Sequence, residues 1–257
     1  MLDKLPNEIL HSIVSNVSYQ EMNELRQTSR LLRKFCDCSI YWKNLELVLK
    51  ENKFWKLSFL NSILSPHIGD VKSIEIRGVH DSVIRYLLLK CINLQYLTIH
   101  GWNTLSDHSL RLYSQQNTSL VKFSLFGTPN KSNYISVNAD TLGKLMIQSP
   151  NITHILILCQ IHIHAESLIS LLEGANKLLA LESFTIASSR TWHKEHIIRL
   201  NYICPNIQRV CLLPGAANAG ISSESHFERW LHEQTETLSS DISLVTEDDC
   251  IIFAKSA

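Results

Sequence analysis

The residues best suited to chemistry in this chain are histidines and a cysteine that gather between positions 154 and 164. His154, Cys159, His162 and His164 carry the ring nitrogens and the thiol that bind transition metals. On a strand, His162 and His164 would share one face at a spacing that a single metal ion could bridge. Zinc sites usually need four ligands in fixed geometry, however, and the sequence holds no matching partner pair. We therefore favour solvated loop histidines and predict neither a metal nor a cofactor.

The familiar sequence patterns of catalysis are missing too. The sequence has no G-x-S-x-G segment to expose a nucleophilic serine, and none of its eight glycines falls in a G-x-G-x-x-G or G-x-x-x-x-G-K phosphate-binding pattern. Cys36 and Cys38 are one residue apart rather than the two of a redox or metal pair, so we expect one of them to be a buried helix residue. The seven cysteines are odd in number and scattered, which indicates reduced thiols in a cytoplasmic or nuclear protein. We predict no catalytic residue and a protein that is not an enzyme.

Composition argues against two kinds of partner. The 257 residues are 45% hydrophobic and include 24 basic and 24 acidic residues, so the net charge is zero. No overall positive field exists to attract nucleic acid or an anionic membrane. Residues 1–10 include acidic residues and a proline where a secretory signal needs a basic start and an apolar stretch. No apolar run approaches the roughly 20 residues of a membrane span. We expect neither a nucleic-acid nor a membrane partner.

A repeated apolar pattern organises most of the remaining chain. The pattern apolar-x-x-apolar-x-apolar starts weakly at Val71 and then recurs five times, with middle residues 23 to 32 positions apart. Those middle residues are Ile74, Leu97, Phe123, Ile155, Phe184 and Val210. Helical patterns follow the strand patterns at 81–89, from Ser106 onward, and at 140–147, 166–172 and 196–203. Because leucine-rich repeats have periods of about 20 to 29 residues, we predict an α/β solenoid with parallel strands on one face and helices on the other.

The alternate residues of each predicted strand must face away from the helices. These positions start polar or aromatic and become apolar in the middle strands, as a protein-binding concave face can do. The residues that we predict to bind a target on this face are Tyr96, His100, Lys122, Phe126, His154, Leu156 and Arg209. The tryptophans Trp55, Trp102 and Trp192 are expected to pack in the core or between repeats rather than to anchor a partner.

The first 45 residues have a helical period instead. The apolar stripe of the first helix contains Ile9, Leu10, Ile13, Val14 and Val17. This helix is expected to start near Pro6 and to end near Val17, because proline suits the first helical position. Ser18 and Glu21 form a capping-box pattern that predicts an immediate second helix. A third apolar stripe covers residues 31–35, and Trp42 ends the block.

The ordered string Leu5-Pro6-x-Glu8-Ile9-Leu10, Ile13, Leu25-Arg26-Gln27 and Trp42-x-x-Leu45 resembles the F-box motif. In that family three helices dock on a small Skp-family adaptor, which links to a cullin and RING scaffold that ubiquitinates the bound target. The adaptor-binding residues that the resemblance implies are Leu5, Pro6, Ile9, Leu10 and Ile13. It also implies that Trp42 closes the motif against the following domain. Ser18-Tyr19-Gln20 and Thr28-Ser29 depart from the family pattern.

Three junctions between helix and strand support the same assignment. The segments Lys90-Cys91-Ile92-Asn93-Leu94, Ser149-Pro150-Asn151-Ile152 and Cys204-Pro205-Asn206-Ile207 precede strands in one register. They resemble the C-P-x-L junction of the cysteine-containing leucine-rich repeats that commonly follow an F-box. We therefore expect an F-box over 1–45, repeats over 46–213 with a degenerate first copy, and a C-terminal cap over 214–257. The cap is expected to contain a helix at 223–237 and short strands at 242–245 and 250–253.

Together these observations predict a non-catalytic substrate-recognition subunit of a cullin–RING ubiquitin ligase of the SCF type. Its partners would be a Skp-family adaptor, through it the cullin and RING subunits, and an unknown target protein. The alternative is a repeat scaffold that acts without a ligase and uses its N-terminal helices only as a cap or a dimer contact. Binding to the adaptor distinguishes the two hypotheses.

Overall fold

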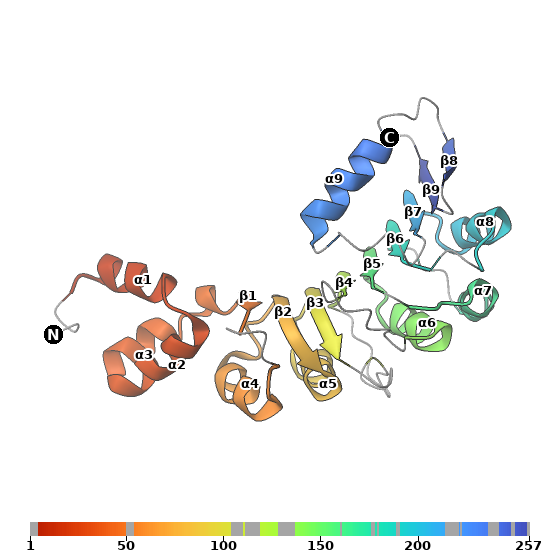
Figure 1. Cartoon of the computed structure of the whole chain (residues 1–257). Coiled ribbons are helices and arrows are strands. Elements are labelled where there is room, and N and C mark those ends of the chain that lie inside the picture. Colours follow the sequence, from red (N-terminus) through yellow and green to blue (C-terminus); the bar gives the residue numbers. More distant parts are fainter. Residues whose placement is uncertain are drawn as a thin grey trace.

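Three short helices stand at one end of a curved α/β sheet in the computed structural model (Figure 1). The structure describes residues 5–49, 54–103, 110, 119–127, 137–159, 161–175, 178, 180–188, 191–213, 221, 223–235, 242–247 and 250–255. The three helices are α1 (Asn7–Ser15), α2 (Tyr19–Thr28) and α3 (Arg30–Cys36). The predicted helix after Ser106 lies outside the described residues, apart from the buried Leu110.

Side-chain caps explain where the N-terminal helices begin. The Ser18 hydroxyl accepts a hydrogen bond from the Glu21 N–H at 3.3 Å, and the Glu21 carboxylate accepts from the Ser18 N–H at 2.8 Å. The predicted capping box of α2 is therefore confirmed. Ser29 caps α3 by accepting from the Leu32 N–H at 3.1 Å. Helix α1 ends at Ser15, two residues before the predicted end.

Within the described ranges seven parallel strands follow, and helices lie between most of them. The strands are β1 (Asn44–Leu47), β2 (Ser73–His80), β3 (Tyr96–Asn103), β4 (Lys122–Phe126), β5 (His154–Leu158), β6 (Ser183–Ile186) and β7 (Arg209–Leu212). The α-helices between them are α4 (Leu57–Leu64), α5 (Asp81–Lys90), α6 (Ala139–Gln148), α7 (Ala165–Glu173) and α8 (Lys194–Ile203). Figure 1 shows these helices on the convex side of the arc. The result is a leucine-rich-repeat-like α/β architecture, as predicted.

The C-terminal elements close the far end of the sheet. Strand β9 (Cys250–Lys255) pairs antiparallel with β7, and β8 (Ile242–Glu247) pairs antiparallel with β9. The described residues thus form one mixed sheet of nine strands in the order β1-β2-β3-β4-β5-β6-β7-β9-β8. Helix α9 (Glu224–Thr235) lies on the concave side, opposite the other helices. Both predicted terminal strands and the predicted helix are present, with ends within two residues of those expected.

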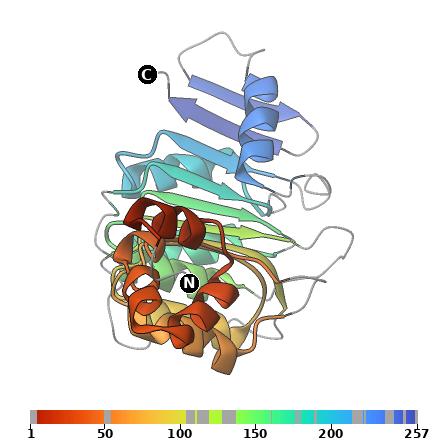
Figure 2. The same cartoon turned by 90° about the vertical axis from the view of Figure 1, so that its left-hand side faces the viewer.

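The strand register confirms the repeat spacing. Ile74 pairs with Leu97, Leu97 with Phe123, and the series continues through the middle residues of β5, β6 and β7. Each middle residue is almost completely buried. Seen from the N-terminal end, the strands stack one above another (Figure 2). One apolar residue of every repeat therefore lies in a continuous core beneath the sheet.

The three helix-to-strand junctions also share one geometry. Cys91, Ser149 and Cys204 are the buried C-cap residues of α5, α6 and α8, with ψ angles of 78°, 73° and 79°. The carbonyl of each cap accepts a hydrogen bond of 3.0 Å from the N–H three residues later. The same short turn thus precedes β3, β5 and β7. The junction residues singled out in the sequence are structurally equivalent positions.

A pair of glycines redirects the chain at the ends of β2 and β3. Gly78 and Gly101 have φ values of 72° and 65°, which side chains other than glycine rarely adopt. The two glycines occupy equivalent positions of adjacent strands, because Arg77 pairs with His100 before them and Val79 pairs with Trp102 after them. The burial alternation shifts by one residue at each glycine, so Val79 and Trp102 enter the core instead of facing outward.

Candidate functional site

Helix α1 presents an apolar stripe to solvent. Ile9 is 47% exposed, Pro6 is exposed, and Leu5 and Ile13 are half-buried. Leu10, by contrast, is only 1% exposed and packs in the core, so its expected place on this surface is wrong. The reason is helical geometry: Leu10 is one turn from the fully buried Val14, whereas Ile9 and Ile13 are neighbours on another face. We call the surface of Leu5, Pro6, Ile9 and Ile13 the α1 face.

A second exposed apolar residue lies on an element that packs against α1. Ile40 belongs to the 3-10 helix η2 (Ser39–Tyr41) and is 65% exposed. The adjoining Tyr41 hydroxyl donates to the His11 carbonyl at 3.3 Å, and the His11 ring also meets Phe35 edge-on at 4.9 Å. The sequence reasoning missed Ile40. Its signal was a single large apolar residue between two polar side chains in a short turn.

Trp42 attaches these helices to the sheet. Its indole N–H donates to the Cys36 carbonyl at 2.7 Å, and its ring stacks on His67 of the 3-10 helix η4 (Ser65–His67). Asp37 accepts a hydrogen bond from Arg26 and lies 3.3 Å from the His67 ring. Tyr19 adds a hydrogen bond from its hydroxyl to the carbonyl at the start of β1. The α1 face therefore has a fixed orientation relative to the repeats.

The predicted target-binding residues occupy the concave face in three rows. Strand register places Tyr96, Lys122, His154, Ser183 and Arg209 in one row across β3 to β7. His100 and Phe126 are aligned in a second row, and Leu156 belongs to a third, so all the predicted target-binding side chains share the face opposite α4 to α8. Their exposure, however, differs strongly along the sheet.

Helix α9 covers the C-terminal half of this face. Phe126 and Leu156 are 0% and 5% exposed, because they pack in a cluster with the buried Phe227 and Leu231 of α9. The other members of the cluster are Leu158, Cys211, Leu213 and Ile252, with Ile221 and Trp230 at its edge. The expectation that Phe126 and Leu156 lie open to a target is thus wrong.

Two ion pairs hold the polar side of α9 on the same strands. Lys122, at the start of β4, pairs with Glu224, and Arg209, at the start of β7, donates two hydrogen bonds to Glu228 at 2.9 and 3.1 Å. His154 lies between these strands and is half-buried. Burial and the neighbouring Lys122 lower the pKa of His154 below its usual value. Lys122 and Arg209 therefore bind α9 in this conformation.

His100 is also buried, at 7% exposure, which corrects its predicted accessibility. Its ring stacks on Phe126 with centroids 4.8 Å apart, and its Nε2 lies 3.0 Å from a carboxylate oxygen of Glu75. The same oxygen of Glu75 accepts a hydrogen bond from Arg77 at 2.9 Å. His100 thus marks the boundary between the covered and open halves of the concave face.

The open half lies over β1 to β3. Its outward side chains include Glu46, Glu75, Arg77, Tyr96 and Thr98. Tyr96 is 43% exposed and is the most accessible residue of the predicted target-binding set, whose other members are buried or half-buried. We call this surface the open concave face.

The histidines considered for metal binding do not lie on one strand. His154 lies on β5, while His162 and His164 are exposed in the segment between β5 and α7 rather than on a strand. Cys159 is buried, and burial raises the pKa of its thiol. Within the described part of the chain, no group of three or more His, Cys, Asp or Glu side chains is placed to hold a metal ion.

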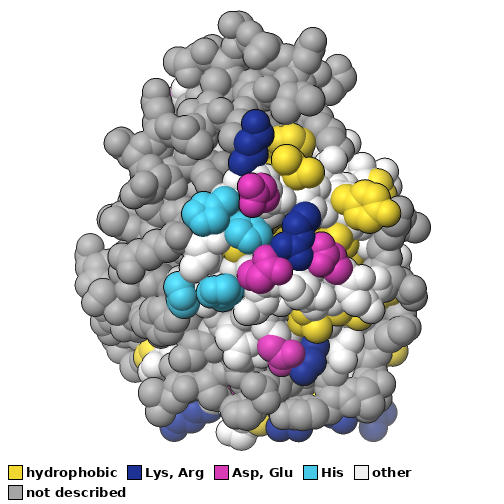
Figure 3. Space-filling model, turned by 90° about the vertical axis from the view of Figure 1, so that its right-hand side faces the viewer, with side chains coloured by type: hydrophobic (Ala, Val, Ile, Leu, Met, Phe, Trp, Pro, Cys, Tyr) yellow, Lys and Arg dark blue, Asp and Glu magenta, His cyan; other side chains and the backbone are white. Residues whose placement is uncertain are grey.

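Charged and histidine side chains do gather on the outer surface of the last repeats (Figure 3). Arg199 of α8 donates to Glu166 and Glu173 of α7, each at 2.7 Å, and His196 lies 3.4 Å from Glu166. The hydrogen bonds from Arg199 and Ser170 lower the pKa of Glu166 to about 2. These contacts join two successive helices, which accounts for the cluster without a ligand.

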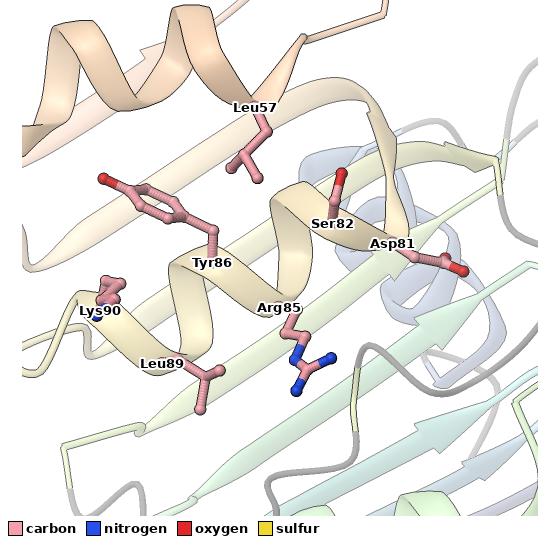
Figure 4. Close-up of a pocket in the computed structure, with 7 residues that line it drawn as sticks. All are labelled: Leu57, Asp81, Ser82, Arg85, Tyr86, Leu89 and Lys90. Atoms are coloured by element: carbon pink, nitrogen blue, oxygen red, sulfur yellow. The ribbon is translucent and has the colours of Figure 1, made fainter.

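A shallow pocket of about 350 Å³ lies between α4 and α5 on the convex side (Figure 4). Its lining residues are Leu57, Asp81, Ser82, Arg85, Tyr86, Leu89 and Lys90. In Figure 4 the Arg85 side chain points away from Tyr86 and Leu57, so the polar groups do not converge.

No helix in the described ranges is both long and apolar enough to cross a membrane.

Comparison with known families identifies the N-terminal helices. Residues 2–47 match the F-box-like family model, which covers α1 to α3 and continues to the end of β1. No curated protein matches the chain. The chain therefore contains an F-box-like domain, followed by a parallel α/β sheet that is consistent with leucine-rich repeats.

Proposed function

We propose that this protein is the substrate-recognition subunit of a cullin–RING ubiquitin ligase of the SCF type. The F-box-like match over residues 2–47 carries the proposal, because F-box domains bind a Skp-family adaptor. Through that adaptor the chain would join the cullin and RING subunits, which supply the catalysis. The proposal implies a cytoplasmic or nuclear protein that is not itself an enzyme.

The exposed α1 face supports this assignment. When a partner covers an exposed apolar side chain such as Ile9, the free energy of the complex falls by roughly 25 cal/mol per Å² of apolar surface removed from water. Ile9 and Ile40 lie on elements that contact each other, so one partner surface could cover both. We propose that adaptor binding uses Leu5, Pro6, Ile9 and Ile13, together with Ile40.

Fixed geometry supplies the mechanism. The adaptor and the target would be held at opposite parts of one rigid body, because the Trp42 contacts join the helices to the sheet. Holding a target lysine near the transferred ubiquitin raises its effective concentration. We propose an F-box over 1–45, repeats over 46–213 and a cap over 214–257. The open concave face, including Tyr96, is the accessible part of the proposed target surface.

Co-purification with a Skp-family adaptor tests the function. The variant Ile9→Asp places a charge in the proposed interface and is expected to abolish binding. Asn7→Asp adds the same charge to another exposed position of α1 and should keep binding. Folded wild-type protein that ignores the adaptor would instead favour a ligase-independent scaffold. Equal binding by both variants would remove the α1 face from the interface.

A further inference from the structure

The concave face over β4 to β7 is covered by the amphipathic helix α9, and we call this covered part of the face the groove. The apolar strand side chains that contribute to it are Phe126, Leu156, Leu158, Cys211 and Leu213, and the small polar Ser124 and Thr185 lie in the same row as Leu156. Phe227 and Leu231, four residues apart on α9, insert into this surface and are fully or almost fully buried. Trp230 lies half-buried beside them, with its ring 6.0 Å from that of Phe227. This spacing is the usual arrangement of anchors in helix-in-groove recognition.

The rim of the groove is basic and the bound helix is acidic. Lys122 and Arg209 stand at the same row position of β4 and β7, with His154 between them. They pair with Glu224 and Glu228, which are one helical turn apart on α9. Charge complementarity therefore specifies the register of the helix as well as its polarity.

The apolar character of the face begins where α9 begins. In the row that runs from Arg77 on β2 to His100 on β3, the next residues are Phe126 on β4 and Leu158 on β5. The row that starts at Glu46 is mixed beneath α9, where Leu156 and Cys211 alternate with Ser124 and Thr185. The outward side chains of the uncovered strands are mostly polar, and the large apolar outward side chains Phe126, Leu156 and Leu158 lie on strands beneath α9. The sheet is thus built for a helix over β4 to β7.

The attachment of α9 is local. Among the described side chains of α9, two are buried, and the acidic partners of both ion pairs are more than 40% exposed. Exposed ion pairs are screened by water and salt, and helices with few buried side chains open more readily than the core of a domain. The groove can consequently exchange its own helix for another of the same chemistry.

We propose that the groove over β4 to β7 is a docking site for an amphipathic helix of the target protein. The helix would carry two acidic residues one turn apart, with an aromatic residue and a leucine four apart on its apolar side, and it competes with α9 for the groove. This inference rests on the proposed function for the identity of the partner. In the free protein, α9 would occupy the site of the target helix, and the target helix would displace it.

Fluorescence anisotropy with a labelled synthetic peptide of residues 221–235 tests the exchange. The peptide is titrated into the full chain, into Glu228→Lys and into Glu233→Lys. Both variants reverse one charge of α9, and of the two residues Glu228 is the one that forms an ion pair with Arg209 of the groove. The apparent affinity rises with the fraction of protein whose groove is open. Glu228→Lys is expected to bind the peptide about tenfold more tightly than wild type, and Glu233→Lys as wild type does.

A peptide with both Phe227→Ala and Leu231→Ala should bind none of these proteins. Absence of binding to folded Glu228→Lys, or equal gains for both variants, overturns the proposal. If circular dichroism shows that Glu228→Lys does not fold, Glu228→Gln replaces it with the same expected direction. The adaptor experiment is independent: loss of adaptor binding with peptide binding retained refutes the ligase function but leaves the groove assignment intact.

Discussion

The indole ring of Trp42 and the imidazole ring of His67 stack with centroids 3.9 Å apart and planes within 13° of each other. Trp42 lies near the end of the F-box-like domain, and His67 lies between α4 and β2. Both side chains are buried. The proposed adaptor surface and the proposed target surface are therefore connected through a packed aromatic contact rather than a loose linker.

Trp42→Ala is expected to lower the free energy of unfolding by about 3–5 kcal/mol, as large-to-small changes at buried aromatics do. The variant loses the stack on His67 and the hydrogen bond to the Cys36 carbonyl. Denaturant unfolding measures the change. Trp42→Phe keeps an aromatic ring and loses the N–H donor, so its expected loss is about 1–3 kcal/mol. Equal losses in both variants would contradict a stabilising role for the stack.

His67 should make the stability of the protein depend on pH. Burial, followed by the charge of Arg26, lowers the pKa of His67 below 6.5, although Asp37 and Asp70 act in the opposite direction. The folded state then binds the proton less readily than the unfolded state. The contribution of neutral His67 to the free energy of unfolding is therefore fully present above pH 6.5. It is lost as the pH falls through 6.5 toward the folded-state pKa.

Unfolding free energies measured between pH 7.5 and 5 test this dependence. His67→Gln should flatten the curve in the region just below pH 6.5. His162→Gln removes an exposed histidine and should leave the slope as in wild type. His154 has a lowered pKa as well, so part of the slope is expected to persist in His67→Gln. An unchanged slope in His67→Gln would show that Trp42 stacks on a histidine whose protonation is not coupled to folding.

The repeats and the N-terminal helices were predictable because their signals are local. Leu97 and Phe123 repeat a short pattern, and Ser18 with Glu21 encodes its own helix start within four residues. Leu10 was misplaced for a different reason. Periodicity identifies an apolar stripe, but which edge of a wide stripe faces the core depends on the neighbouring helices.

The covering of the concave face could not be predicted from local patterns. Lys122 and Glu224 are 102 positions apart, so no periodicity connects them. The sequence did contain both halves of the contact: apolar residues such as Leu156 at outward strand positions, and a helix with Phe227 and Leu231. An apolar outward row fits an open binding face and a covered face equally well, and only tertiary structure distinguishes the two.

Buried thiols at the repeat junctions should be unreactive in the folded protein. Burial raises the pKa of Cys91 and of Cys204 to about 12, so the reactive thiolate is scarce at pH 8. Among the described cysteines none forms a disulfide, and Cys38 is partly exposed. In a Cys250→Ser background, we expect a thiol reagent to modify Cys38 rapidly at pH 8, while Cys91 and Cys204 react only after unfolding.

Cys38→Ser should remove the rapid phase of that reaction, whereas Cys204→Ser should leave it unchanged. Rapid modification of Cys91 or Cys204 without loss of structure would contradict the burial of these junctions. The experiment thereby tests the repeat geometry directly, because both thiols are C-cap residues of equivalent helices.

Helix α9 should open without unfolding of the sheet beneath it. Phe227 is the larger of its two buried side chains, and Phe227→Ala is expected to weaken the contact by about 3–5 kcal/mol. Hydrogen exchange of the amides of α9 should then accelerate, while the amides of β5 keep their wild-type protection, because local openings expose only the segment that moves. Arg229→Ala changes an exposed position of the same helix and should alter neither. If protection in α9 and β5 falls together, α9 belongs to the same cooperative unit as the strands, and its release by a competing helix would require unfolding of the repeats.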